Sequence, residues 1–513
     1  MIQVIHNCKK VLKISKDNQF LDIYNDLNIS ETIYKLTELF PSELILWCHT
    51  DLVSFINQEQ ITSICNSNSE IISYTISNEN YISTNIGFVE QSIFINFSRK
   101  IKTATWQMSS DIGIAHSDIF SALKTTIKPD ADFDYFLNSV AKTAMPLGVF
   151  CYSDPNLLKE KNINIVFNHK INFSKLFRFV SQHYKKVWLL VLLVGLLYKK
   201  RKFPILAFLK SLFYAKISID KIKISNFKLL PIKEAEYSND IDVLIPTIGR
   251  KEPLYNFLKN LSEQTILPKS IIIIEQNPIV NAVSELNYLV SESWPFQIKH
   301  QLIYQLGACN ARNLALKEVT SNWVFFADDD IEIKNDFLEN CLDNANKYKQ
   351  QAFSLSCLLR NEKKQFNNCF QWVSFGSGAS FVNANAIKDL KFDSKYEFGF
   401  GEDSDFGMQI RNKGNDIIYF PTPEIKHLKA PIGGFRTKVN RKWDDDVIGP
   451  KPSPTVMVFK LTYDSKEQFF AYKLMYFFRN YNFKDFKNPI KKYKIMISKW
   501  NRSVYWAEKL MQE

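Results

Sequence analysis

Two groups of acidic residues have the composition and spacing to do chemistry. In the first, Asp328, Asp329 and Asp330 follow the hydrophobic run NWVFFA. Adjacent carboxylates repel one another, so a fold tolerates them where they cap a helix, face water or hold a cation. Two of them, together with substrate phosphates, would suit Mg²⁺ or Mn²⁺. A helix cap within DDDIEIKNDF explains the same residues equally well.

The second group is Glu402, Asp403 and Asp405, in the segment YEFGFGEDSDFGMQIRNKG. The segment predicts a helix that starts near the acids and stops at a glycine. Carboxylates in a first helical turn gain from the helix dipole, which is the structural explanation. The chemical explanation is a general base that deprotonates a hydroxyl within hydrogen-bond reach.

A third stretch, YFPTPEIKHLKAPIGGFR, adds groups that bind anions or metals. His427 follows a predicted strand and could ligate a metal or a phosphate oxygen, although a lone histidine is more often structural. Gly433, Gly434 and Arg436 predict a flexible loop with a planar cation, which suits a diphosphate.

The elements around these groups are predicted to form a parallel sheet. Pro246, Thr247 and Arg250 follow one strand, DVLIP, and Glu275 ends the next, SIIIIEQ. From residue 242 onward, continuous hydrophobic runs alternate with helical patterns, which indicates an α/β fold with helices on both faces of the sheet. Ligands of such sheets bind outside the carboxyl ends of the strands, where all of these groups fall.

Five segments in this order resemble the family-2 nucleotide-sugar glycosyltransferases, which have a GT-A fold. They are IDVLIPTIGRKEPLYNFLKNLSEQTILPKSIIIIEQ, LGACNARNLALKEVTSNWVFFADDDIEI, GSGASFVNANAI, FGFGEDSDF and IKHLKAPIGGFR. The resemblance spans residues 240 to 440. It implies a Rossmann-like, mainly parallel sheet and an inverting transfer of sugar from a nucleoside-diphosphate sugar to a hydroxyl.

The resemblance also implies a role for each matched residue. Asp403 matches the catalytic base, and Asp330 and His427 match the positions that hold Mg²⁺ or Mn²⁺. Trp443 and Asp444 lie where acceptor contacts often occur. The family usually has Asp where this chain has Glu275, which weakens that one assignment. The nucleotide-sugar positions are Pro246, Thr247, Arg250, Glu275, Arg312, Asp328, Gly378, Glu402 and Arg436.

We expect four parts along the 513 residues. Residues 1–168 form an α/β domain, 169–238 a basic helical linker, 239–449 the GT-A domain, and 450–513 a basic, aromatic helical extension. Residues 1–168 resemble the GT-A fold in degraded form, with His49, Thr50 and Asp51 at the position of the aspartate run and without their own active site. An unrelated α/β domain explains these residues about as well.

The positive charge is concentrated in two segments. The formal net charge is +12, and residues 170 to 219 contain 11 Lys or Arg and no Asp or Glu. Residues 451 to 513 contain 13 basic and 5 acidic residues, so the rest of the chain is slightly acidic. This distribution argues against nucleic acid as a partner. It favours helices on an anionic membrane surface; a buried inter-domain helix is the alternative, and a spanning helix is the least favoured.

The sequence therefore predicts a glycosyltransferase acting on a glycan or lipid-linked acceptor in cell-surface polysaccharide or glycolipid synthesis. Eight cysteines without metal-ligand spacing, and a beginning without a signal peptide, predict a cytoplasmic protein, peripheral at the inner face of the plasma membrane. The alternative function is a catalytically inactive GT-A subunit that binds carbohydrate or serves as a scaffold.

Overall fold

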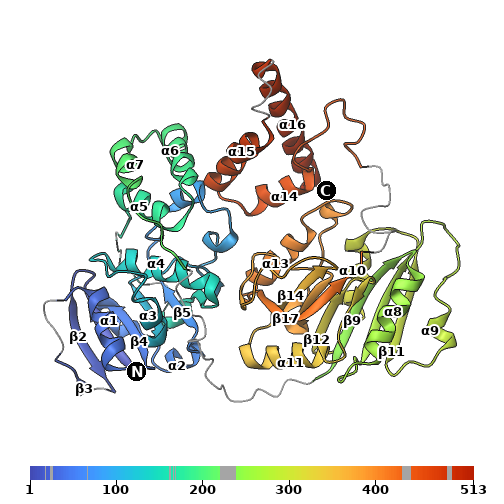
Figure 1. Ribbon diagram of the computed structural model, residues 1–513, viewed down its shortest axis with the longest axis horizontal. Coiled ribbons are helices and arrows are strands. Elements are labelled where there is room, and N and C mark those ends of the chain that lie inside the picture. Colours follow the sequence, from blue (N-terminus) through green and yellow to red (C-terminus); the bar gives the residue numbers. More distant parts are fainter. Residues whose placement is uncertain are drawn as a thin grey trace. The chain divides into compact units, whose positions relative to one another are not determined.

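The computed structural model describes residues 1–17, 19–22, 27–65, 67–160, 163, 165, 167, 169–219, 239–429, 441–481 and 488–513. The chain divides into two compact units (Figure 1). The first comprises Met1–Ile232 with Tyr463–Asn480, and the second Lys233–Thr462 with Tyr481–Glu513. Each contains one mixed β-sheet with helices, so the predicted α/β class is confirmed.

The sheet of the second unit begins with four parallel strands. Its order is β11-β10-β9-β12-β16-β14-β17-β13, and β16 runs antiparallel to both of its neighbours. Strands β9, β10 and β12 are almost wholly buried, because their side chains are apolar on both faces. The bounds are β9 (Ile241–Ile248), β10 (Ser270–Gln276), β11 (Gln297–Ile303), β12 (Trp323–Ala327), β13 (Ile331–Glu332), β14 (Ala352–Leu359), β16 (Ala379–Asn383) and β17 (Ile418–His427).

Amphipathic helices connect these strands. Helix α8 buries Leu254, Phe257, Leu258 and Leu261, whose spacing places them on one face. Helix α10 packs on β9 and β10, and α13 leads into β17. The bounds are α8 (Lys251–Ser262), α9 (Tyr288–Ser291), α10 (Ala308–Lys317), α11 (Phe337–Tyr348), α12 (Ala384–Ile387), α13 (Glu402–Asn412), α14 (Pro454–Tyr463) and α16 (Pro489–Leu510), with β15 (Phe370–Gln371) beside β17.

The sheet of the first unit has the order β3-β2-β1-β4-β7-β5-β8-β6. Helices α1, α3 and α4 pack against one another in this unit. The bounds are β1 (Ile2–His6), β2 (Val11–Lys16), β3 (Gln19–Phe20), α1 (Ile29–Leu39), β4 (Leu44–His49), α2 (Ile61–Ile64), β5 (Glu70–Tyr74), β6 (Thr103–Ala104), β7 (Ile112–His116), α3 (Ser117–Leu123), α4 (Phe133–Ala144) and β8 (Phe150–Ser153).

The five central strands of the two sheets have the same arrangement. The order β1-β4-β7-β5-β8 matches β9-β12-β16-β14-β17 in sequence order and in the direction of each pairing. They differ beyond the first of these strands. Strand β9 is joined through α8 to the parallel strand β10, whereas β1 turns directly into the antiparallel strand β2.

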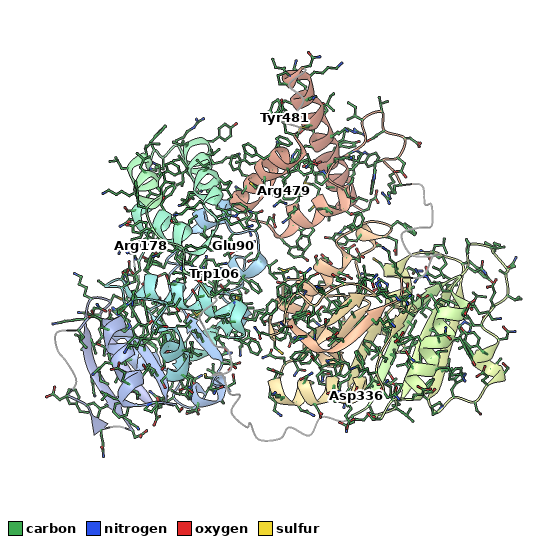
Figure 2. All side chains as sticks on the ribbon, in the orientation of Figure 1. Glu90, Trp106, Arg178, Asp336, Arg479 and Tyr481 are labelled. Atoms are coloured by element: carbon green, nitrogen blue, oxygen red, sulfur yellow. The ribbon has the colours of Figure 1, made fainter. Side chains whose placement is uncertain are left out.

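Four further helices belong to the first unit: α5 (Phe173–His183), α6 (Val187–Lys200), α7 (Ile205–Ser211) and α15 (Lys466–Asn480). Phe179 of α5 stacks on Trp106, and Arg178 lies over the Tyr135 ring (Figure 2). Among the described residues, no helix has the length and hydropathy needed to cross a membrane. The helices of segment 450–513 are divided between the units, and the boundaries of the four predicted parts stay predictions.

Candidate active site

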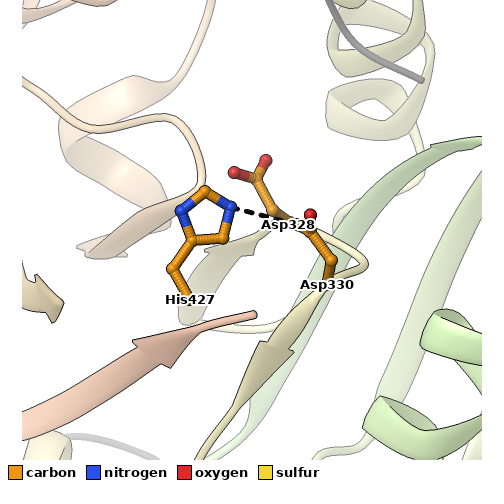
Figure 3. Close-up of side chains that lie close together, drawn as sticks. All are labelled: Asp328, Asp330 and His427. Atoms are coloured by element: carbon orange, nitrogen blue, oxygen red, sulfur yellow. Dashed lines mark ion pairs between the residues drawn. The ribbon is translucent and has the colours of Figure 1, made fainter. Parts of the chain in front are cut away.

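Asp328, Asp330 and His427 meet at the carboxyl edge of the second sheet (Figure 3). The two aspartates follow β12, and His427 ends β17, where it pairs with Ile331 of β13. His427 Nε2 lies 3.3 Å from Asp330 Oδ1, and one ligand atom from each of the three residues lies within 4.8 Å of the others. Within the described part of the chain this is the one group of that kind. Two carboxylates and an imidazole fit a divalent cation such as Mg²⁺ or Mn²⁺.

The middle aspartate, to which the sequence assigned no role, is a structural link. Asp329 is 2% exposed and accepts a hydrogen bond of 2.6 Å from Thr247 Oγ1. Arg250 forms an ion pair with Asp329 and also lies 3.3 Å from Asp330 Oδ2. Burial raises the pKa of Asp329 to about 6 although the Arg250 charge opposes this. The loop after β9 is thereby tied to the end of β12, and no helix begins at these aspartates.

Arg312 and Gly378 shape the environment of Asp328. Arg312, buried in α10, places Nη2 3.6 Å from Asp328 Oδ1. A Cβ atom on Gly378 would lie 2.2 Å from Asp328 Oδ2, so only glycine permits this close approach. Both residues, predicted from separate motifs, therefore converge on the same carboxylate.

Asp403 stands in the first turn of α13, where the helix dipole favours its negative charge. Its Oδ1 accepts a hydrogen bond of 3.2 Å from the Ser377 amide. Burial raises the pKa of Asp403, while the charge of Arg312 and the Ser377 hydrogen bonds oppose that rise. Burial and the neighbouring Asp403 charge raise the pKa of Glu402 to about 7. Arg312 thus interacts with both the Asp328 side and the Asp403 side of the site.

A glutamate outside the predicted set fixes the loop before α13. Glu397 accepts hydrogen bonds from the amides of Cys309 and Asn310, at 3.0 and 2.9 Å, and so caps the start of α10. Gly307, with φ of +142°, makes room for it, because a Cβ there would lie 2.4 Å from Glu397 Cδ. The motifs LGACNAR and YEFGFGED contain both partners, but only the tertiary structure pairs them.

The predicted nucleoside residues lie on one edge. Thr247 and Glu275 are partners in the register of β9 and β10, and Pro246 precedes Thr247. The Glu275 carboxylate is already engaged: it lies 2.8 Å from His300 Nε2 and accepts a bond of 3.2 Å from the Glu285 amide. Its direct contact with a nucleoside stays a prediction.

The predicted acceptor residues lie in another part of the second unit. Trp443 lines a cavity of about 950 Å³, and its ring lies 6.3 Å from Trp506 of α16. The exposed Asp444 accepts a bond of 2.8 Å from the Arg441 amide within its own turn. Asp446 holds this segment on α16 by pairing with Arg502. The predicted Arg436 falls outside the described residues.

Register places a counterpart of the aspartate run in the first unit. Leu44 pairs with His116, which caps α3, just as Trp323 pairs with Asn383, which caps α12. The amide of His49 then donates to Asp111 O, and that of Asp328 donates to Gly378 O. Counting along each strand, His49, Thr50 and Asp51 occupy the positions of Asp328, Asp329 and Asp330, which agrees with the expected placement.

The first unit also has a carboxylate at the position of Asp403. Asp134 is the second residue of α4, as Asp403 is the second residue of α13. The Ser110 amide donates to Asp134 Oδ1 at 2.8 Å, matching the bond from Ser377 to Asp403. The sequence did not predict this position, because DFD at residues 132–134 shares only its last residue with GED at residues 401–403.

The surroundings of Asp134 are closed. His49 packs against Phe167, with ring centroids 4.3 Å apart, and Cys8 Sγ lies 3.4 Å from His169 Nε2. Asp134 is 6% exposed, and burial raises its pKa to about 7. Helix α1, which precedes β4 as α10 precedes β12, contains no arginine that could match Arg312.

Residues 242–386 match the model of the family described as "Glycosyl transferase family 2". The predicted family resemblance is confirmed over that segment, which supports glycosyl transfer as the type of reaction. The match ends before Asp403 and His427, so their roles rest on geometry.

Solved structures with a similar fold include two of TarS from S. aureus. TarS 1-349 in complex with UDP-GlcNAc has a TM-score of 0.37 and 14% identity over 53% of this chain and 82% of that one. TarS 1-349 alone has a TM-score of 0.32 and 16% identity over 37% and 60%. GalNAc-T7 with UDP, GalNAc and Mn²⁺ has a TM-score of 0.37 and 10% identity over 53% and 56%.

The alignment thus spans less than two thirds of TarS 1-349 alone and of GalNAc-T7. Likenesses this distant define no substrate or acceptor for this chain. No curated protein matches the sequence.

Proposed function

We propose that the second unit is an inverting glycosyltransferase that uses a nucleoside-diphosphate sugar and a glycan acceptor. The observation that supports this best is the convergence of Asp328, Asp330 and His427 at one strand edge, with Arg312 connecting Asp328 to the environment of Asp403. An inactive scaffold would have no need for both a cation site and a half-buried carboxylate at a helix start beside it.

Asp403 acts as the general base in this proposal. The acceptor hydroxyl oxygen forms a bond to the anomeric carbon while the bond from that carbon to the diphosphate oxygen breaks. The hydroxyl proton passes to the Asp403 carboxylate. Because burial raises the pKa of Asp403, the carboxylate is a stronger base than an exposed aspartate.

Asp330, His427 and Asp328 would hold Mg²⁺ or Mn²⁺ in the proposed site. When bound, such a cation stabilises the negative charge that develops on the leaving diphosphate. Arg250 and Arg312 add fixed positive charge at the same edge. Thr247 and Glu275 lie toward the predicted nucleoside side.

We place the acceptor in contact with the segment around Trp443 and Asp444. An indole ring beside a cavity of about 950 Å³ can stack on the apolar face of a sugar. The acceptor is proposed to be lipid-linked, in cell-surface polysaccharide or glycolipid synthesis. The protein would then be cytoplasmic and peripheral at the inner face of the plasma membrane.

We also propose that the first unit is a second GT-A-like domain without a donor site of its own. The shared order of five strands, the shared register and the bond from Ser110 to Asp134 support this. The β1–β2 hairpin stands where the second unit has β9 and β10, and Phe167 packs on His49.

A donor screen tests the proposed transferase. Nucleoside-diphosphate sugars are added with Mn²⁺, and binding is detected as a rise in melting temperature. The donor that binds is then followed for Mn²⁺-dependent hydrolysis or transfer. We expect one donor to bind and turn over, with turnover lost in Asp330→Ala. Turnover by Asp330→Ala at the wild-type rate, or no donor binding at all, would contradict the proposal.

A further inference from the structure

Helix α6 presents a row of apolar side chains to solvent. Val187, Leu190, Val194 and Tyr198 are 48, 54, 40 and 63% exposed. Their spacing of three, four and four residues places them along one face of the helix. Exposed apolar residues are ordinary when single, but a continuous row marks a surface that is covered by something else.

The opposite face of α6 is fixed on the first unit. Leu189, Leu192 and Leu196 are fully buried. A Cβ on Gly195 would lie 2.5 Å from the Phe88 ring, so the helix is in close contact with that ring. Helix α6 therefore cannot rotate to bury its exposed row without losing these core contacts.

Further apolar side chains are exposed on α7 and its flanks. Leu206 is 75% exposed and Phe213 is 90% exposed, while Phe203 in the connection between the helices is 74% exposed. Lys186 Nζ donates to the carbonyls of Leu212 and Tyr214, at 3.1 and 2.7 Å, which holds the end of α7 beside the start of α6. The two helices form a hairpin whose members lie side by side (Figure 1). We call the exposed apolar residues of 187–213 the α6–α7 face.

Within the hairpin itself the charge has one sign, and Lys200 forms an ion pair with Glu467 of the neighbouring helix α15. Residues 170 to 219 contain 11 basic and no acidic residues. Lys199, Lys200, Arg201 and Lys202 follow one another at the turn of the hairpin, and Lys210 lies on α7. Lysine side chains beside exposed leucine and phenylalanine can enter the lipid headgroup layer with their stems along the apolar surface.

We propose that the α6–α7 face docks onto an anionic lipid bilayer, with both helices lying in the headgroup layer. Helix α6 has 14 residues, a length of about 21 Å, which is short of the roughly 30 Å of a hydrocarbon core. A protein partner is disfavoured because lysine is depleted from protein interfaces. A second copy is disfavoured because two such faces would repel each other.

This proposal deepens the proposed function, because it names the surface from which a lipid-linked acceptor would be reached. It does not depend on sugar transfer. The face and the candidate active site lie in different units, so a variant of one leaves the side chains of the other unchanged.

Flotation of the full chain with vesicles tests the docking. Vesicles of phosphatidylcholine with phosphatidylglycerol are compared with vesicles of phosphatidylcholine alone, at low and high salt. We expect binding to the anionic vesicles only, weakened by salt. The double variant Leu206→Asp and Phe213→Asp should bind at least about tenfold more weakly. Lys202→Glu with Lys210→Glu should do the same, since each basic residue near such a surface contributes roughly fivefold.

Phe20→Asp is the matched control, because Phe20 is a 64% exposed aromatic residue of the first unit outside the face. It should bind vesicles like the wild type. Equal flotation of the wild type and both double variants would overturn the proposal, as would failure of the wild type to float. Light scattering is run in parallel. A wild-type dimer that becomes monomeric in the double variant Leu206→Asp and Phe213→Asp would assign the face to self-association instead. Asp403→Asn should float normally, so failed docking and failed transfer give different results.

Discussion

The two sheets present the same five-strand frame with different chemistry at the same edge. In the second unit, Asp328, Asp330 and His427 converge at the ends of β12 and β17. In the first unit, the end of β4 holds His49, Thr50 and Asp51, and Phe167 packs on the histidine. The same frame therefore carries a group of three possible metal ligands in one unit and a histidine covered by an aromatic ring in the other.

The comparison shows which features identify a site. A carboxylate bonded by a serine amide occurs in both units, as the half-buried Asp403 with Ser377 and as the buried Asp134 with Ser110. Among the described residues, only the second unit has an arginine, Arg312, within interaction range of that carboxylate and of the aspartate run. The base position by itself is thus weak evidence for catalysis, because the same hydrogen bond also holds a helix end to a strand.

The largest expected effect separates the two carboxylates. Asp403→Asn should lower the turnover number by about 10²–10⁴-fold, because the acceptor proton loses its base, while donor binding is spared. Asp134→Asn should leave turnover unchanged. Rate measurements at saturating donor check both. Equal losses of turnover in the two variants would mean that the first unit participates in transfer. A wild-type turnover number in Asp403→Asn would show that Asp403 is not the general base.

The next effect concerns the cation. Asp330→Ala should weaken Mn²⁺-dependent donor binding by at least about tenfold, because a hard oxygen ligand is lost. Asp51→Ala, the matched change in the first unit, should not alter it. Titration of Mn²⁺ in the presence of donor, followed by melting temperature, measures both. If Mn²⁺-dependent donor binding weakened only in Asp51→Ala, the cation would belong to the first unit instead.

A smaller effect is expected in the pH dependence of the rate. The base must be ionised, so turnover should fall as pH decreases through the raised pKa of Asp403. Ser377→Ala keeps the amide bond but removes the side-chain hydrogen bond that lowers this pKa, so the acid limb should move to higher pH. Ser110→Ala is the control and should leave the profile in place. Because Asp403 and Glu402 interact, the profile reports the pair.

Part of the frame was predictable from sequence because strands β9, β10 and β12 consist largely of hydrophobic runs. The run WVFFA and the acids after it gave both the strand and its end. Asp329 was left without a role, since its partners Thr247 and Arg250 lie about 80 positions earlier in the chain. Ser377 and Glu397 were missed for the same reason: their contacts depend on register between elements, and neither residue type is distinctive.

The first unit shows the limit more sharply. Its base-position aspartate stands in the sequence DFDYF, which contains no glycine and no adjacent Glu-Asp pair. Only its place at the start of α4 and the bond from the Ser110 amide align it with Asp403. The first unit has the strand order of the second but lacks its motif. Strand packing constrains side-chain size and polarity, whereas a loop that holds no ligand lacks that constraint.

The smallest effect on transfer is expected for Asp134→Asn. This variant should instead change the stability of the chain. Burial raises its pKa from 3.8 to about 7 in the folded chain, with the charges of Asp111 and Asp132 adding to the rise and the Ser110 bonds opposing it. A raised carboxyl pKa favours the folded state below the unfolded pKa, and this contribution is lost as pH rises toward 7. Asp134→Asn cannot ionise.

The free energy of unfolding of the variant, minus that of the wild type, should therefore increase by up to about 4 kcal/mol between pH 4 and pH 8. Urea unfolding of the full chain at the two pH values measures it. A difference that stays constant with pH would show that Asp134 titrates like an exposed aspartate. The edge around His49 would then be open to water, and the contrast between the two units would be lost.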